Sequence, residues 1–277
     1  MGAIADLDTL TNLITGGGAG APETVWWSKD SRVAAAAAAA TVAGRWTSLW
    51  SYNGQPSDGA TPGAAANPTN ATSGALKQTD AGGGRQKWLL SVAAGNNVAG
   101  TLILYDRLLH NGGLSGTTTT AQTVGGTLSR STSGVGNVMW AEIYTAVGAT
   151  ATTITCSYTN EVPTSGRTSQ ATPFGGTGSN EAQRVIPLPL AQGDWGVTAV
   201  ANITVLASTL TAGSFGVTIA NPFVVIPLGV VGMGGIRDLI TTAAIMPIEA
   251  GACLAWLWHA NGTTAPILMG HANFVEV

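Results

Sequence analysis

The feature that most constrains the fold is an alternation of apolar and polar side chains over two neighbouring runs, residues 139–147 and 151–159. In the first run one face carries Met139, Ala141, Ile143 and Val147, and the other carries Trp140, Glu142 and Tyr144. In the second run Ile154, Cys156 and Tyr158 lie opposite Thr153, Thr155 and Ser157. A period of two over this length predicts half-buried β-strands. The short segment 148–150 between the runs predicts a tight antiparallel connection.

Similar segments recur along the rest of the chain. Strand-like runs occur at 88–94, 99–108, 184–190, 196–206, 214–227, 252–259 and 266–275. Links rich in Gly, Pro, Ser and Thr separate them, and the segment 236–240 is expected to form a short helix or a turn. Many strands with such links and few helices predict an all-β fold, namely an antiparallel β-sandwich of jelly-roll-like type.

The N-terminal region has a different pattern, which predicts two short helices. Apolar residues at helical spacing predict a helix over 4–15. The run of alanines at 34–40 predicts a second helix over 32–43, because alanine is the best helix former. The alternative for the alanine run is a low-complexity segment without structure.

These patterns divide the chain into three parts: a helical N-terminal arm at 1–52, a long loop or connector at 53–84 and a β-sandwich domain at 85–277. Helices this short are not stable alone, so each needs a surface on which to pack. Tryptophan is enriched among the residues that contribute most to binding at interfaces. We expect the arm to attach the protein to a partner through Trp26, Trp27, Trp46 and Trp50. The alternative is that both helices cover the protein's own sheet.

Charge is unusually sparse for a chain of this length. The chain has 11 Lys and Arg and 14 Asp and Glu, or 9% of its residues, whereas a soluble domain carries about 25%. Two explanations are open: uncharged Thr, Ser, Asn and Gly side chains cover the surface, or much of the surface is buried in an assembly. We expect a homo-oligomer, either a trimer or a dimer. The net charge of −3 argues against a nucleic-acid partner. No apolar run reaches the length of about eighteen residues that a membrane span needs, so no membrane partner is expected.

Residue types that carry out catalysis are present without the spacing that catalysis needs. The histidines His110, His259 and His271 lack metal-ligand spacing, and no cofactor-binding motif is complete. Glu142 lies between two aromatic residues, which would suit a sugar site, but no second acid lies at strand spacing from it. We therefore predict that the protein is not an enzyme and holds no metal or cofactor.

Polar and aromatic residues of the central region are instead expected to form a structural network, whose members are Tyr105, Asp106, Arg107, Glu142, Tyr144 and Tyr158. Charge-assisted hydrogen bonds at the end of a strand would hold such a network together. Cys156 and Cys253 lie inside apolar runs, so both are expected to be buried free thiols rather than a disulfide.

Five short motifs in this region carry a resemblance to a known class of protein. They are YDRL at 105–108, GGL at 112–114, EIYT at 142–145, YTN at 158–160 and GRT at 166–168. As a series across residues 99–170, they resemble structural proteins of tailed bacteriophages. The resemblance implies a β-sandwich component of the virion, of the head-decoration (cement) or fibre-like type, which is made in the host cytoplasm and incorporated into particles.

We therefore expect a capsid decoration or cement protein that binds the major capsid protein or other virion proteins and stabilises the shell through symmetric contacts. One alternative is a tail-fibre or receptor-binding module, which would form a slender trimer and bind carbohydrate. A weaker alternative is a major capsid protein, which would need a long spine helix and an extended arm. The sequence shows neither of these.

Overall fold

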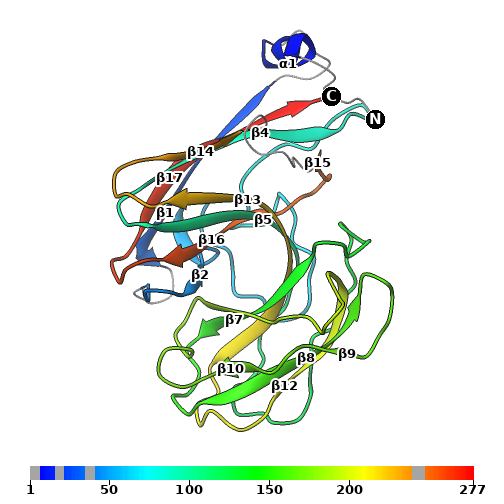
Figure 1. Ribbon diagram of the computed structural model, residues 1–277, viewed down its shortest axis with the longest axis vertical. Helices are drawn as coiled ribbons and strands as arrows, with labels where there is room; N and C mark the ends of the chain where they lie inside the picture. Colours follow the sequence, from blue (N-terminus) through cyan, green and yellow to red (C-terminus); the bar gives the residue numbers. More distant parts are fainter. Residues whose placement is uncertain (1–6, 16–21, 35–40, 239–246) are drawn as a thin grey trace.

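The structure is a computed structural model that describes residues 7–15, 22–34, 41–238 and 247–277. Apart from one short helix, α1 (Leu7–Ile14), the regular structure of the described chain consists of antiparallel strands. Figure 1 shows two lobes along the long axis of the molecule, with β13 passing from the lower lobe into the upper one. The all-β antiparallel class predicted from the sequence is confirmed.

The central sheet is a closed barrel with the strand order β11-β2-β16-β5-β13-β7. Its members are β2 (Trp46–Ser48), β5 (Gly100–His110), β7 (Val138–Thr145), β11 (Arg184–Pro187), β13 (Ser214–Leu228) and β16 (Leu254–Ala260). The longest of them, β13, pairs with β7 over its first half and with β5 from Thr218 to its end. The barrel therefore contributes strands to both lobes.

An outer sheet lies against the barrel in each lobe. The upper one has the order β14-β4-β17-β1-β3, with β15 also paired to β4. Its members are β1 (Glu23–Ala34), β3 (Tyr52–Gln55), β4 (Lys87–Asn96), β14 (Gly235–Asp238), β15 (Pro247–Ile248) and β17 (Ile267–Glu276). The lower one has the order β10-β8-β12-β6, with β9 paired to β8. Its members are β6 (Gln122–Thr123), β8 (Thr152–Asn160), β9 (Arg167–Thr168), β10 (Thr172–Phe174) and β12 (Val197–Val205).

Side chains of the barrel strands alternate between the barrel interior and an outer core. Between the barrel and the upper sheet lies a core that includes Trp27, Leu104, Trp256 and Phe274. Between the barrel and the lower sheet lies a second core that includes Met139, Cys156, Phe215 and Ile219. A third cluster, with Trp50, Tyr105, Trp140, Val185 and Leu257, fills the barrel. Both outer sheets are thus packed on one shared barrel.

The predicted helical N-terminal arm is wrong. The helix α1 does fall within the predicted helix 4–15, but the start of the predicted helix 32–43 is strand, and residues 41–43 are not helical. The alanines at 35–40 lie outside the described residues. β1 is an inner strand between β17 and β3, and it buries Trp27 and Lys29. Within β1, pairing on both sides outweighs the helix propensity of residues 32–34.

The predicted connection between the two alternating runs is also wrong. The first run is β7 of the barrel and the second is β8 of the lower sheet, and these strands do not pair with each other. Segment 148–150 therefore carries the chain from one sheet to another. Moreover β7 is buried on both faces, and Glu142 faces the barrel interior rather than solvent. The alternation in the sequence shows that β7 has an apolar face and a more polar face. It does not show that a second core covers the polar face.

Two further segments can be compared with the expectations from the sequence, a long loop and the segment 236–240. The long loop expected at 53–84 begins later than expected, because residues 53–55 belong to β3. Residues 56–86 contain no strand and make a single isolated bridge, Ala66 to His110. This loop packs on the barrel, where Leu76 is buried and its amide donates to the Leu254 carbonyl over 2.8 Å. The short helix or turn expected at 236–240 is wrong for residues 236–238, which belong to β14, while 239 and 240 lie outside the described residues.

Candidate functional site

The most deeply buried ion pair of the described residues is enclosed by the barrel. Nη2 of Arg107, on β5, lies 2.6 Å from Oε2 of Glu142, on β7, and both side chains are at most 1% exposed. Thr218, on β13, donates its hydroxyl to the same carboxylate oxygen over 2.8 Å. Three barrel strands therefore meet at this carboxylate. A buried ion pair is tolerated only when further hydrogen bonds satisfy both partners, and this pair has them.

Aromatic and imidazole side chains surround the guanidinium of Arg107. It donates to the hydroxyls of Tyr105 and Tyr144, over 3.2 and 3.1 Å, and its Nε donates to Nδ1 of His110 over 2.8 Å. The Trp50 ring stacks with its centroid 4.6 Å from the guanidinium carbon. Because Nδ1 of His110 accepts a hydrogen bond, its proton lies on Nε2. Burial, and then the charge of Arg107, lower the pKa of His110 to about 3.

The structural network expected from the sequence is divided into three in the structure. Tyr105, Arg107, Glu142 and Tyr144 lie together in the barrel. Asp106 points to the opposite side of β5, where Arg130 binds it through Nε and Nη2, both at 3.0 Å. Tyr158 lies in the lower lobe and donates to Asp194 over 2.5 Å. The three groups are structural in their contacts, since each holds strands or loops of this chain to one another.

The candidate binding surface lies on the outer face of the upper sheet. Register pairing places Ile236, Ala93, His271 and Trp26 in one row across four strands, from β14 to β1. The Trp26 side chain is 69% exposed, and its ring centroid lies 5.1 Å from that of His271. Met269 follows on the same face, two residues from His271 along β17, and it is also mostly exposed.

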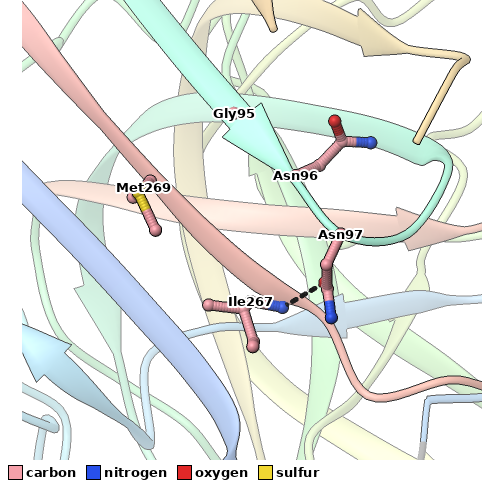
Figure 2. Close-up of a pocket in the computed structure, with 5 residues that line it drawn as sticks. All are labelled: Gly95, Asn96, Asn97, Ile267 and Met269. Atoms are coloured by element: carbon pink, nitrogen blue, oxygen red, sulfur yellow. Dashed lines mark hydrogen bonds between the residues drawn. The ribbon is translucent and has the colours of Figure 1, made fainter. Parts of the chain in front are cut away.

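A shallow pocket continues this face to the end of β4 and the start of β17. It has a volume of about 260 Å³ and is lined by Gly95, Asn96, Asn97, Ile267 and Met269. Figure 2 shows Ile267 and Met269 along β17, and Asn97 at the turn after β4, where its side-chain oxygen accepts from the amide of Ile267 over 2.6 Å. This hydrogen bond fixes the end of the pocket.

The turn between β13 and β14 adds three exposed apolar side chains beside the pocket. They are Val230, Val231 and Met233. The amide of Gly232 donates to the Asn96 carbonyl over 3.0 Å, which holds the turn against the end of β4. We name the exposed apolar residues of this region, together with the half-buried Ile267 of the pocket, the outer patch; its members are Trp26, Val230, Val231, Met233, Ile236, Ile267 and Met269. None of them is charged, and methionine adapts its shape to different partners.

The structure separates the four tryptophans that the sequence suggested for attachment. Trp27 and Trp50 are buried in the protein's own cores, so a partner cannot reach them, and Trp46 is half-buried against His259 with ring centroids 4.7 Å apart. Trp26 alone among the four lies mostly in solvent. The residues that sequence reasoning missed are the rest of the outer patch. Alternation along β17 places Met269 opposite buried Leu268, but it does not tell which face is covered.

The two cysteines are free and buried, as predicted. The described part of the chain contains no group of three or more His, Cys, Asp or Glu side chains that could hold a metal ion. Among the described helices, none has the length and apolar character to span a membrane. Comparisons with known protein families, with curated proteins and with solved structures find no match.

Proposed function

We propose that the protein is a non-catalytic structural component of a bacteriophage virion, which acts as a head-decoration (cement) protein. The observation that carries the proposal is the outer patch, an exposed apolar surface on a chain with only 9% charged residues. Apolar surface of this kind is typical of a face that another protein covers. The proposed partner is the major capsid protein of the shell. The sheet-on-barrel packing is, in this proposal, a variant of the jelly-roll-like sandwich that the resemblance implies.

The buried ion pair supports a structural rather than a catalytic role. In the described part of the chain, the side chains of Arg107 and Glu142 contact side chains of the barrel strands and the Trp50 ring, and neither reaches solvent. A substrate could not contact them without opening the barrel. In this proposal the cluster stabilises the subunit, and function lies at the surface.

We include in the proposal that the subunits form a homo-oligomer, either a trimer or a dimer. Symmetric copies bind a shell through many simultaneous contacts, so that modest contacts add up to stable attachment. Light scattering of the purified protein is expected to give twice or three times the chain mass of 27.8 kDa. A monomer at micromolar concentration contradicts this part of the proposal.

The attachment experiment uses particles of the encoding phage, grown with the gene deleted. Purified wild-type protein is added, and the bound copies per particle are measured by sedimentation and gel densitometry. We expect saturable binding to heads. The variants Trp26→Ala and Met269→Lys, both in the outer patch, are expected to weaken it at least tenfold.

The matched control is Leu206→Lys, which places the same charge on a mostly exposed apolar position of the lower lobe. This variant should bind as the wild type does. Wild-type occupancy by Met269→Lys would show that the outer patch is not the attachment surface. Binding to tails instead of heads would replace the decoration role by the fibre or receptor-binding role.

A further inference from the structure

A second surface site lies on the lower lobe, where an exposed tryptophan stands beside a hydrogen-bonded group of polar side chains. Trp195 is 71% exposed, although its backbone is held on both sides. Its amide donates to Oε2 of Glu161 over 3.4 Å, and its carbonyl accepts from the amide of Gly136 over 3.2 Å. The indole ring is therefore presented to solvent from a fixed position.

The residue before it, Asp194, holds the neighbouring loops in place. Its carboxylate accepts from Tyr158 over 2.5 Å, from Asn160 over 3.0 Å, and from two nitrogens of Arg167 over 2.8 and 3.0 Å. The hydrogen bonds from Arg167, and then from Tyr158, lower the pKa of Asp194 to about 2. Four hydrogen bonds to one carboxylate join β8, β9 and the loop before β12. The surroundings of Trp195 are thus organised before any ligand arrives.

Two polar side chains that hold the segment 194–195 retain free hydrogen-bonding capacity. The Arg167 side chain is one third exposed, and within the described residues its Nη1 has no acceptor. Glu161 uses Oε2 for the Trp195 amide, while no described donor reaches Oε1. A donor and an acceptor are therefore both bound to the segment that carries the exposed Trp195 side chain, through Asp194 and through the Trp195 amide.

We infer that this group, Trp195 with Glu161 and Arg167, is a binding site for a neutral glycan. The C–H face of a pyranose ring packs on an indole face, while its hydroxyls both donate and accept hydrogen bonds, as Arg167 and Glu161 require. The charge of Arg167 is already neutralised by Asp194, so the site offers no free cation to an acidic sugar. It is separate from the outer patch, which lies on the sheet of the other lobe (Figure 1).

The test is a glycan microarray that carries neutral and acidic bacterial polysaccharides, followed by affinity electrophoresis with each polysaccharide that binds. We expect the full-length protein to bind one or more neutral glycans. Trp195→Ala is expected to reduce that affinity at least tenfold, and Trp195→Phe, which keeps an aromatic face, should retain part of it. Glu161→Gln is expected to weaken binding less than Trp195→Ala does.

Two controls separate this inference from the proposed attachment to the shell. Trp26→Ala removes the exposed tryptophan of the outer patch and should bind glycan as the wild type does. Trp195→Ala should unfold at the wild-type temperature and still attach to heads. The inference is overturned if no neutral glycan binds, if only acidic glycans bind, or if Trp195→Ala binds with wild-type affinity.

Discussion

At the scale of single residues, the enclosed ion pair dominates the polar interior. Arg107 and Glu142 are held inside the barrel by partners on β5, β7 and β13. Removing one member of such a pair leaves the other as a buried charge without its counter-ion, which costs more than the pair itself contributes. Buried polar residues therefore contribute to stability beside the apolar cores, in a chain with little charge.

Replacing Glu142 by Gln keeps the size of the side chain and removes its charge. We expect the free energy of unfolding to fall by about 3 to 5 kcal/mol, because Arg107 stays buried and charged. Urea denaturation measures this change. The same substitution at Glu161, on the surface, should change the free energy by less than about 0.5 kcal/mol. Equal effects at the two positions would show that the enclosed pair is not special.

His110 gives the protein a defined pH dependence. Its folded-state pKa of about 3 lies below the value of about 6.5 for an unfolded chain, so the unfolded state binds the proton first as pH falls. The stabilisation is complete above pH 6.5 and is lost progressively between 6.5 and 3. At pH 5 the loss amounts to about 2 kcal/mol.

The measurement compares urea denaturation of the wild type and His110→Gln at pH 7.5 and pH 5. Glutamine can still accept the hydrogen bond from Nε of Arg107, but it does not titrate. The difference between the two pH values should be about 2 kcal/mol smaller in the variant. If both proteins lose the same amount, His110 is not the titrating group.

At the scale of elements, the strands were predictable and their partners were not. The runs expected at 196–206, 214–227 and 266–275 correspond to β12, β13 and β17 within two residues at each end. Alternation is a local property that the sequence displays directly. Pairing depends on register between distant segments, and so the placement of β7 and β8 in different sheets had no local signal.

Of the candidate site, the sequence predicts only the residue whose type is itself typical of interfaces, a tryptophan. The sequence points to Trp26 only as a tryptophan, and it points equally to Trp27 and Trp50, which the cores of the protein enclose. One position along a strand moves a side chain to the opposite face, so neighbours such as Trp26 and Trp27 differ completely in exposure. Which face a second sheet covers is decided by the whole fold.

At Gly148 a glycine is required by a close contact between two backbone segments rather than by a turn. A Cβ at this position would lie 1.6 Å from the Thr209 carbonyl oxygen, so alanine would force two backbones apart. We expect Gly148→Ala to lower the free energy of unfolding by about 3 kcal/mol or more. Thermal denaturation tests this, with Gly262→Ala as the control, because no atom lies within 4 Å of a Cβ there. A melting temperature unchanged by Gly148→Ala would contradict the close approach.

At the scale of the whole molecule, the N-terminal region is part of the fold. β1 lies between β17 and β3, and the Trp27 ring packs on Trp256 of the barrel with centroids 4.2 Å apart. Deleting residues 1–45 removes this strand, and we expect the upper lobe to lose its cooperative packing. Deleting residues 1–21 removes α1 and leaves β1, and it should shift the melting temperature by only a few degrees.

Near-ultraviolet circular dichroism during heating distinguishes the two deletions, because the upper core contains Trp27 and Trp256. The shorter deletion should keep the wild-type signal, and the longer one should lose much of it. A longer deletion that retains a single sharp transition at the wild-type temperature would show that β1 is dispensable.

β13 also has a mechanical consequence. Its residues pair with β7 in one half and with β5 in the other, and the same strand borders both outer cores. Force applied at opposite ends of the molecule cannot separate the two lobes as independent units, because β13 runs through both of them. Tension passes through the ladders of one continuous strand, and the chain should rupture in a single event rather than in two.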